Sequence, residues 1–82
     1  MMASSVELED AILRLLEERG ADKTICPSEA ARVVAGEDWR ESMPAVREAA
    51  HRLVSRGSIV VTQEGEVVDG NTARGPVRLR LR

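Results

Sequence analysis

Arg47 and His51 are the two residues of this chain whose types and spacing best suit recognition of another molecule. They lie four positions apart in the segment 44–56, so a helix would place them on one face, with Ser55 one turn further on. Arginine can donate two hydrogen bonds to O6 and N7 of guanine, and histidine and serine can contact bases or phosphates. Arg52 lies on the same exposed side. Together these residues predict that the segment is a recognition helix that enters the major groove of DNA.

Three other residues are candidates for contacts with the phosphate backbone. Arg40 lies just before the predicted recognition helix and is expected to hold a phosphate. Arg74 lies in a polar loop between two strands, where a wing would meet the adjacent groove or backbone. Ser28 falls at a helix start, where it contacts a phosphate or simply favours the start of the helix. The alternative for the arginines is that Glu41 and Glu48 pair with them and leave the face merely solvated.

Residue groups that would support catalysis are missing from the sequence. Cys26 precedes a proline at a helix start, but His51, the single histidine, is expected on the exposed face of a different helix. One cysteine and one histidine are too few for a metal site, and no glycine-rich phosphate loop or nucleophile elbow is present. We therefore predict no enzymatic activity, no bound metal and no cofactor, with Cys26 as a structural, partly buried residue.

Apolar residues at helical spacing predict the elements that position these side chains. Ser4 and Glu7 form a capping-box pattern, so the first helix is expected from about Ser5 to Arg19. A second helix is expected from Pro27 to Ala35. The expected packing residues of these two helices are Leu8, Ile12, Leu15 and Leu16, then Ala30, Ala31, Val33 and Val34.

The predicted recognition helix follows a turn at residues 36–38 and a short turn at residues 39–42. It is expected to begin at Met43 or Pro44, because proline cannot lie deep inside a helix. Trp39, the only aromatic residue, is expected to be largely buried rather than stacked on a partner. The residues expected to face the core are Val46, Ala49, Ala50, Leu53 and Val54.

Alternating residues predict β-structure in the last third of the chain. Strands are expected at residues 58–63, 66–69 and 77–82, with a turn at Glu64 and Gly65. Residues 24–26 are expected to form a short strand or an extended connection. In the last strand, the side chains expected to face inward are Val77, Leu79 and Leu81, and those expected outward are Arg78, Arg80 and Arg82.

Length and charge set the remaining limits. The 82 residues suit a single domain over residues 1–82, and the absence of Phe and Tyr requires an aliphatic core. The net charge of −2 is uneven: five basic and ten acidic residues give −5 over residues 1–42, and seven arginines and four acids give +3 over residues 43–82. A polarised molecule of this kind can present a basic face to phosphate. The start of the chain has no basic, apolar signal-peptide pattern, and a lone cysteine fits a reducing cytoplasm.

Several blocks of sequence, spread over residues 8 to 80, match a known family. They are TICPSE at residues 24–29, WR at 39–40, MP at 43–44, VR at 46–47, AA at 49–50 and GPVRLR at 75–80. In these blocks the chain resembles the bacterial domain-of-unknown-function family 3253. The resemblance implies a small winged-helix-like domain, supplies no catalytic residues and leaves the activity open.

These observations together predict an α+β fold, a winged helix-turn-helix with three helices followed by a small antiparallel β-sheet that forms the wing. We expect a cytoplasmic DNA-binding or regulatory module that takes double-stranded DNA as its partner. The alternative is a protein–protein interaction module that docks a partner through the winged-helix surface or through Arg78 and Arg80. No membrane contact is expected, because no apolar run reaches the length of a bilayer. The sequence leaves the oligomeric state open.

Overall fold

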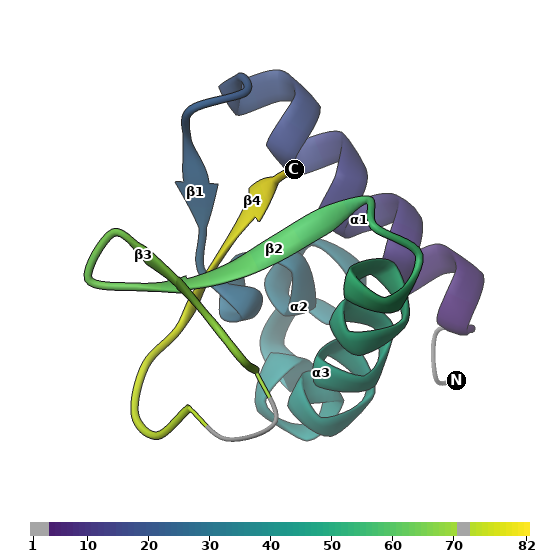
Figure 1. The fold of residues 1–82 in the computed structure, drawn as a ribbon. Helices are drawn as coiled ribbons and strands as arrows, with labels where there is room; N and C mark the ends of the chain where they lie inside the picture. Colours follow the sequence, from purple (N-terminus) through teal and green to yellow (C-terminus); the bar gives the residue numbers. More distant parts are fainter. Residues whose placement is uncertain (1–3, 71–72) are drawn as a thin grey trace.

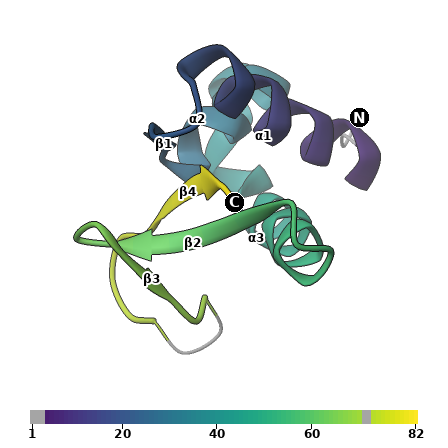
Figure 2. The same cartoon turned by 45° about the horizontal axis from the view of Figure 1, so that its top comes forward.

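The computed structural model describes residues 4–70 and 73–82, and it has a mixed α+β architecture (Figure 1). The helices are α1 (Ser5–Arg19), α2 (Pro27–Ala35) and α3 (Trp39–Ser55). The strands are β1 (Thr24–Ile25), β2 (Ile59–Gln63), β3 (Glu66–Val68) and β4 (Arg78–Leu81). In Figure 2 the helices lie together on one side of the sheet, and the turn of the β2–β3 hairpin projects away from them.

The strands form one antiparallel sheet in the order β1-β4-β2-β3. Strand β4 is therefore an inner strand, in which Leu79 lies opposite both Ile25 of β1 and Val61 of β2. The two residues between β2 and β3, Glu64 and Gly65, both have positive φ, 52° and 85°. Two positive φ angles are typical of the type I′ turns that close tight hairpins, so the predicted turn is confirmed.

Residues 24–26 were expected to form a short strand or an extended connection, and the short strand is confirmed: β1 pairs with β4 at Ile25 and Leu79, and Ile25 is fully buried. The predicted order of three helices followed by a sheet needs one correction. The described residues contain a further helical segment, the 3-10 helix Gly36–Asp38, where a turn was expected, and it leads directly into α3. The coarser expectation of an α+β fold with a small antiparallel sheet is confirmed.

Helix α3 begins earlier than predicted, at Trp39 instead of Met43 or Pro44. Pro44 lies inside the helix but in its second turn. Pro44 lies beyond the first four N–H groups, which have no intrahelical acceptor, so it removes the hydrogen bond to the carbonyl of Arg40; the disturbed bond involves only the first turn, which the rest of the helix extends past. The rule that placed the start at the proline therefore misjudged the boundary by about one turn.

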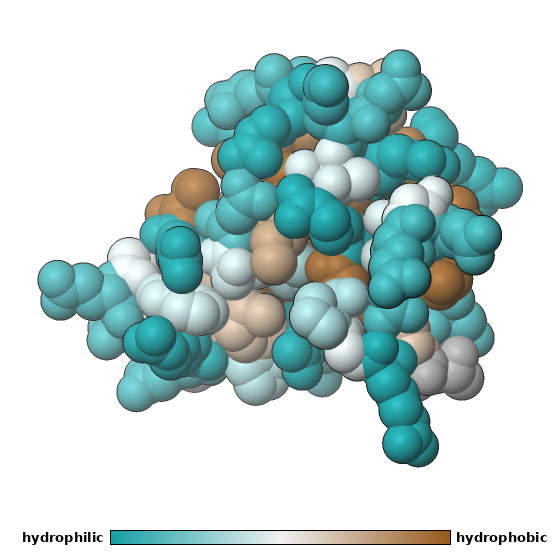
Figure 3. All heavy atoms as spheres, turned by 90° about the vertical axis from the view of Figure 1, so that its left-hand side faces the viewer, coloured by the Kyte–Doolittle hydropathy of each residue, from teal (hydrophilic) through white to brown (hydrophobic). Residues whose placement is uncertain are grey.

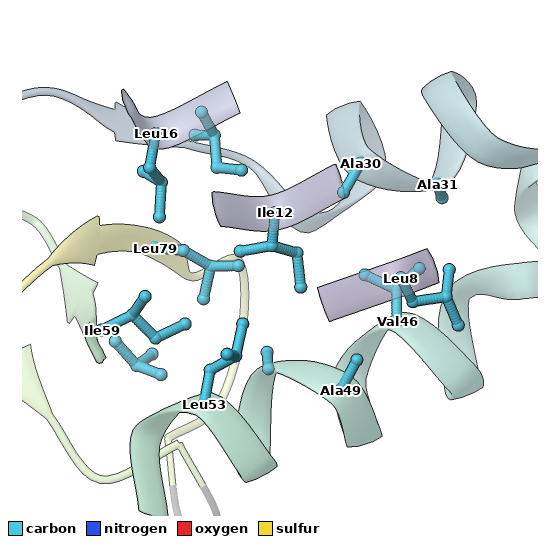
Figure 4. Packing of buried hydrophobic residues seen from close by; sticks show 13 residues of the cluster. Leu8, Ile12, Leu16, Ala30, Ala31, Val46, Ala49, Leu53, Ile59 and Leu79 are labelled. Carbon is cyan, nitrogen blue, oxygen red and sulfur yellow. The ribbon is translucent and has the colours of Figure 1, made fainter. Parts of the chain in front are cut away.

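The core is aliphatic and joins all three α-helices to the sheet. Figure 4 shows Ile12 and Leu16 of α1 on the side of Leu79 and Leu53, and Leu8 of α1 beside Val46 of α3. Helix α2 contributes Ala30 and Ala31 to the same buried cluster. The predicted apolar faces are largely confirmed, because the buried residues of α3 are Val46, Ala49, Ala50 and Leu53.

Two valines predicted to face the core are exposed instead. The exposed fraction is 63% for Val33 on α2 and 37% for Val54 on α3. In each case the adjacent residue faces the core instead. Val34, which follows Val33, packs against the core, and Leu53, which precedes Val54, is fully buried. The stripe that a helix can bury is narrow, and neighbouring residues point about 100° apart, so an adjacent pair seldom faces the core together.

Besides the apolar core, an ionic contact joins α1 to α3. Glu9 of α1 is 9% exposed, and its carboxylate accepts hydrogen bonds from the guanidinium groups of Arg52 and Arg56. The distance from Arg52 Nε to Glu9 Oε2 is 2.9 Å. These two hydrogen bonds lower the pKa of Glu9 below its ordinary value, although burial acts in the opposite direction. Glu9 therefore stays ionised and holds the C-terminal turns of α3 against α1.

Replacing Leu53 should test the packing of α3. Leu53→Ala is expected to lower the free energy of unfolding by about 2–5 kcal/mol, because it opens a cavity in the core. The matched control is Val54→Ala on the exposed side of the same turn, which should change stability by no more than about 0.5 kcal/mol. Urea unfolding followed by far-UV circular dichroism measures both. Equal losses for the two variants would show that the helix face is assigned wrongly.

The pKa of Glu9 makes a pH-dependent prediction. Because the folded state lowers this pKa, the ionised carboxylate stabilises the fold at neutral pH, and that contribution is lost as pH falls below the unfolded value of about 4.3 toward the folded one. Wild type should therefore be more stable than Glu9→Gln at pH 7, with a difference that shrinks between about pH 5 and pH 3. Glu17→Gln, an exposed change on α1 without an ion pair among the described residues, is the control. A difference independent of pH would contradict the ionic role.

Candidate nucleic-acid interface

The exposed face of α3 carries Arg47 and His51, as predicted from their spacing. Both side chains are exposed, and neither has a hydrogen-bond or ion-pair partner within residues 4–70 and 73–82. The alternative in which Glu41 and Glu48 pair with the arginines does not occur in this part of the chain, where the ion-paired carboxylates are Glu9 and Glu29. Arg47 and His51 are therefore free to bind an external acceptor.

A cleft of about 540 Å³ lies beside these two residues. Helix α3 lines it with Met43, Arg47, Ala50 and His51, and the opposite side is formed by the loop before β4, including Ala73 and residues 75–77. Val61 of β2, Leu79 of β4 and the start of α2 at Cys26 and Pro27 complete the lining. The structure thus brings the predicted reading face of α3 and the predicted wing to the two sides of one cleft.

The loop that carries Arg74 is fastened to the sheet by one side chain. The amide Nε2 of Gln63, at the end of β2, donates to the backbone carbonyl of Arg74 and, at 3.4 Å, to that of Pro76. Gly75 between them has a φ of 85°, a conformation that favours glycine. These contacts hold the backbone of the loop in place and leave the guanidinium of Arg74 exposed.

The structure gives Arg52 a different surrounding from the one predicted. It is half-exposed and lines a shallow depression with Arg47, Glu48 and His51, so the predicted grouping on one face is present. Its guanidinium, however, is bound to Glu9. A phosphate would have to compete with that carboxylate, which makes Arg52 first of all a residue that positions α3.

Arg40 lies at the start of α3 and is stacked on Trp39. Its guanidinium carbon is 4.7 Å from the centre of the indole ring, and that of Arg32 on α2 is 4.6 Å away. Trp39 is partly exposed and packs against the edge of the core, which agrees with the expectation that most of its side chain is buried. A ring that stacks two arginines must leave part of its surface outside, and the contact keeps the exposed Arg40 side chain close to the helix start.

Ser28 is half-buried in the first turn of α2 and has no side-chain partner in the described residues. The carboxylate of Glu29 already lies at this helix start, where it accepts from the backbone N–H of Cys26 at 2.7 Å and from Arg19. Burial acts against ionisation of Glu29, but the hydrogen bonds from Arg19 and Cys26 outweigh it and lower the pKa. An anionic side chain at this position weakens the case for a phosphate at Ser28.

Arg78 and Arg80, the predicted docking residues, lie on the inner strand β4. Arg78 donates to the hydroxyl of Thr24 at 2.5 Å and to its carbonyl at 3.1 Å. Because β4 pairs with strands on both sides, it has no free backbone edge to offer to a partner strand. Figure 3, which shows the left-hand side of Figure 1, has mostly hydrophilic residues with small, separate apolar areas between them.

Three features of this region were not found from the sequence: the cleft itself, the anchoring of the loop by Gln63, and the pairing of Glu9 with Arg52 and Arg56. All three join residues far apart in the chain, and no local pattern marks such contacts. Among the described residues, no three His, Cys, Asp or Glu side chains gather closely enough to hold a metal ion. No helix in that part of the chain is long and apolar enough to cross a membrane.

Comparison with known proteins identifies a family but no characterised relative. The model of a family described as "Protein of unknown function (DUF3253)" matches residues 5–82, essentially the whole chain. This confirms the family resemblance expected from the sequence. No curated protein matches the chain.

Gln63 should control how firmly Arg74 is held. In Gln63→Ala the carbonyls of Arg74 and Pro76 lose their donor, so we expect higher amplitudes of backbone motion at residues 74–75 with little change in α3. Backbone ¹⁵N relaxation measures this as a fall in the order parameters of the loop. Glu64→Ala, an exposed change at the next position, is the control, and order parameters unchanged in Gln63→Ala would contradict the anchoring role.

Proposed function

We propose that this chain, which belongs to the DUF3253 family of proteins of unknown function, is a winged-helix module that binds duplex DNA. In this proposal α3 is the recognition helix and the loop before β4, with Arg74, is the wing. The observation that carries the proposal is the cleft that has the unpaired Arg47 and His51 on one side and the loop on the other.

The arrangement of elements supports this reading. Helix α2, the 3-10 helix and the longer helix α3 follow one another with a single tight connection, which suits a helix-turn-helix. Arg47 and His51 are one helical turn apart, about 6 Å along the axis, and the major groove is about 12 Å wide, so both could reach base edges from one inserted helix. The sheet holds the loop on the same side of the molecule as this face of α3.

Electrostatics limits how strong such binding can be. Two of the seven arginines in residues 43–82, Arg52 and Arg56, are neutralised by Glu9. The others have no ion pair within the described part of the chain: Arg47, Arg74, Arg78, Arg80 and Arg82. About three to five phosphate contacts per monomer correspond to a slope of about −3 to −5 in log K against log salt for duplex DNA.

Two arginine substitutions should separate the roles of helix and wing. Arg74→Ala is expected to weaken binding to all sequences alike and to reduce the salt slope by about one, because it removes a backbone contact. Arg47→Ala should cost about 1–3 kcal/mol selectively on the preferred site, because it removes contacts to base edges. Arg14→Ala on α1 removes the same charge from an exposed position in the acidic half and is the matched control. Salt-titrated fluorescence anisotropy on selected and random duplexes measures all three.

A second class of function is decided by the same experiments. If no duplex binds at low salt and pull-downs recover a protein partner that Arg80→Ala releases, the chain is a docking module. Arg80 is the better probe of the two docking candidates, because Arg78 is also needed to join β4 to Thr24 of β1. Equal effects of Arg14→Ala and Arg47→Ala on DNA binding would likewise exclude α3 as a specific reader.

A further inference from the structure

From the cleft between α3 and the loop before β4, we infer a binding site for a small organic anion with an apolar body. This site does not depend on the DNA-binding proposal, because its walls and its charge belong to the free protein. The volume of about 540 Å³ lies within the range of about 300–1,000 Å³ typical of small-molecule sites.

The inner wall of the cleft is apolar. Ala50 of α3, Val61 of β2 and Leu79 of β4 line it, and all three are buried members of the core. Gly70 also lines the cleft and packs closely against this wall, since a Cβ at this position would lie 3.2 Å from Val61 Cγ2. An apolar ligand body placed here would exchange water contacts for contacts with rigid core residues, which favours binding.

The charge at the cleft is positive. Arg47 lines it with a guanidinium that has no acid partner in the described part of the chain, and His51 lines it one turn further along α3. Among the described lining residues there is no Asp or Glu. A carboxylate is the complement of this set, because a guanidinium can donate two parallel hydrogen bonds to it and an imidazole N–H can add a third. Apolar walls below an unpaired cation therefore select an apolar anion over a neutral or cationic ligand.

The test uses 2-naphthoate as the probe and its neutral amide, 2-naphthamide, as the matched ligand. In a ¹H–¹⁵N correlation titration of the full chain without DNA, we expect saturable shifts at the amides of Ala50, Val61 and Leu79 with 2-naphthoate. Arg47→Gln should lower the affinity for 2-naphthoate by about tenfold or more, the loss expected for one charge-assisted hydrogen-bonded pair. The affinity for 2-naphthamide should stay unchanged. Arg14→Gln, a change on α1 outside the cleft lining, should have no effect.

Three results would overturn the inference: no saturable shift with 2-naphthoate, shifts that cluster away from the cleft, or equal binding of the acid and the amide to wild type. The spectrum of Arg47→Gln without ligand shows whether that variant is folded, and Arg47→Lys, which keeps the charge but not the planar fork, should bind with intermediate strength. Failure of DNA binding would leave these results untouched, so the two proposals can be judged separately.

Discussion

The burial of Val46, Ala49, Ala50 and Leu53 along one stripe of α3 is the constraint on which the rest of the structure depends. A helix whose apolar stripe is fixed cannot rotate, so the opposite side, with Arg47 and His51, must face outward. The core has no Phe or Tyr, and α2 contributes the small residues Ala30 and Ala31 to it. Small side chains let helices approach closely, which leaves little freedom for α3 to shift between α1 and the sheet.

Glu9 divides the arginines of α3 into two groups. It binds Arg52 and Arg56 and leaves Arg47 without an acid partner among the described residues. A buried carboxylate without these partners would be costly, so the pair of arginines and Glu9 are required together for the packing of α1 on α3. The charges of Arg52 and Arg56 are thereby paired within the fold. On the exposed face of α3, Arg47 therefore keeps a charge without an acid partner among the described residues, although the number of arginines in the helix suggests a broader basic face.

The sequence predicted the structure best where a single repeat of apolar residues, helical spacing or strict alternation, determines the element. Helical spacing predicted α1 and α2 to the residue, and strict alternation together with Glu64-Gly65 predicted the hairpin and the last strand closely. Errors arose where two local rules compete, as at Pro44, or where adjacent residues share one apolar stripe, as at Val33 and Val54. The contacts of Arg52, Gln63 and Thr24 depend on elements brought together from distant parts of the chain, which no local pattern records. For the same reason, the residues of the candidate interface could be proposed but the cleft between them could not.

An arginine that has no partner inside the fold can bind an external anion without first breaking an ion pair. If Arg52 and Arg56 bound an external anion, the buried carboxylate of Glu9 would lose its partners, which costs free energy. Binding of an anion by Arg47 has no such cost. Apolar residues line the cleft beside Arg47, so an anion with an apolar body can contact both the guanidinium and this wall. Under the two proposals, the guanidinium of Arg47 binds either a DNA base edge or a small carboxylate. Because it cannot bind both at once, each ligand must weaken the other by the same factor, so occupation of the cleft would oppose binding of DNA through α3.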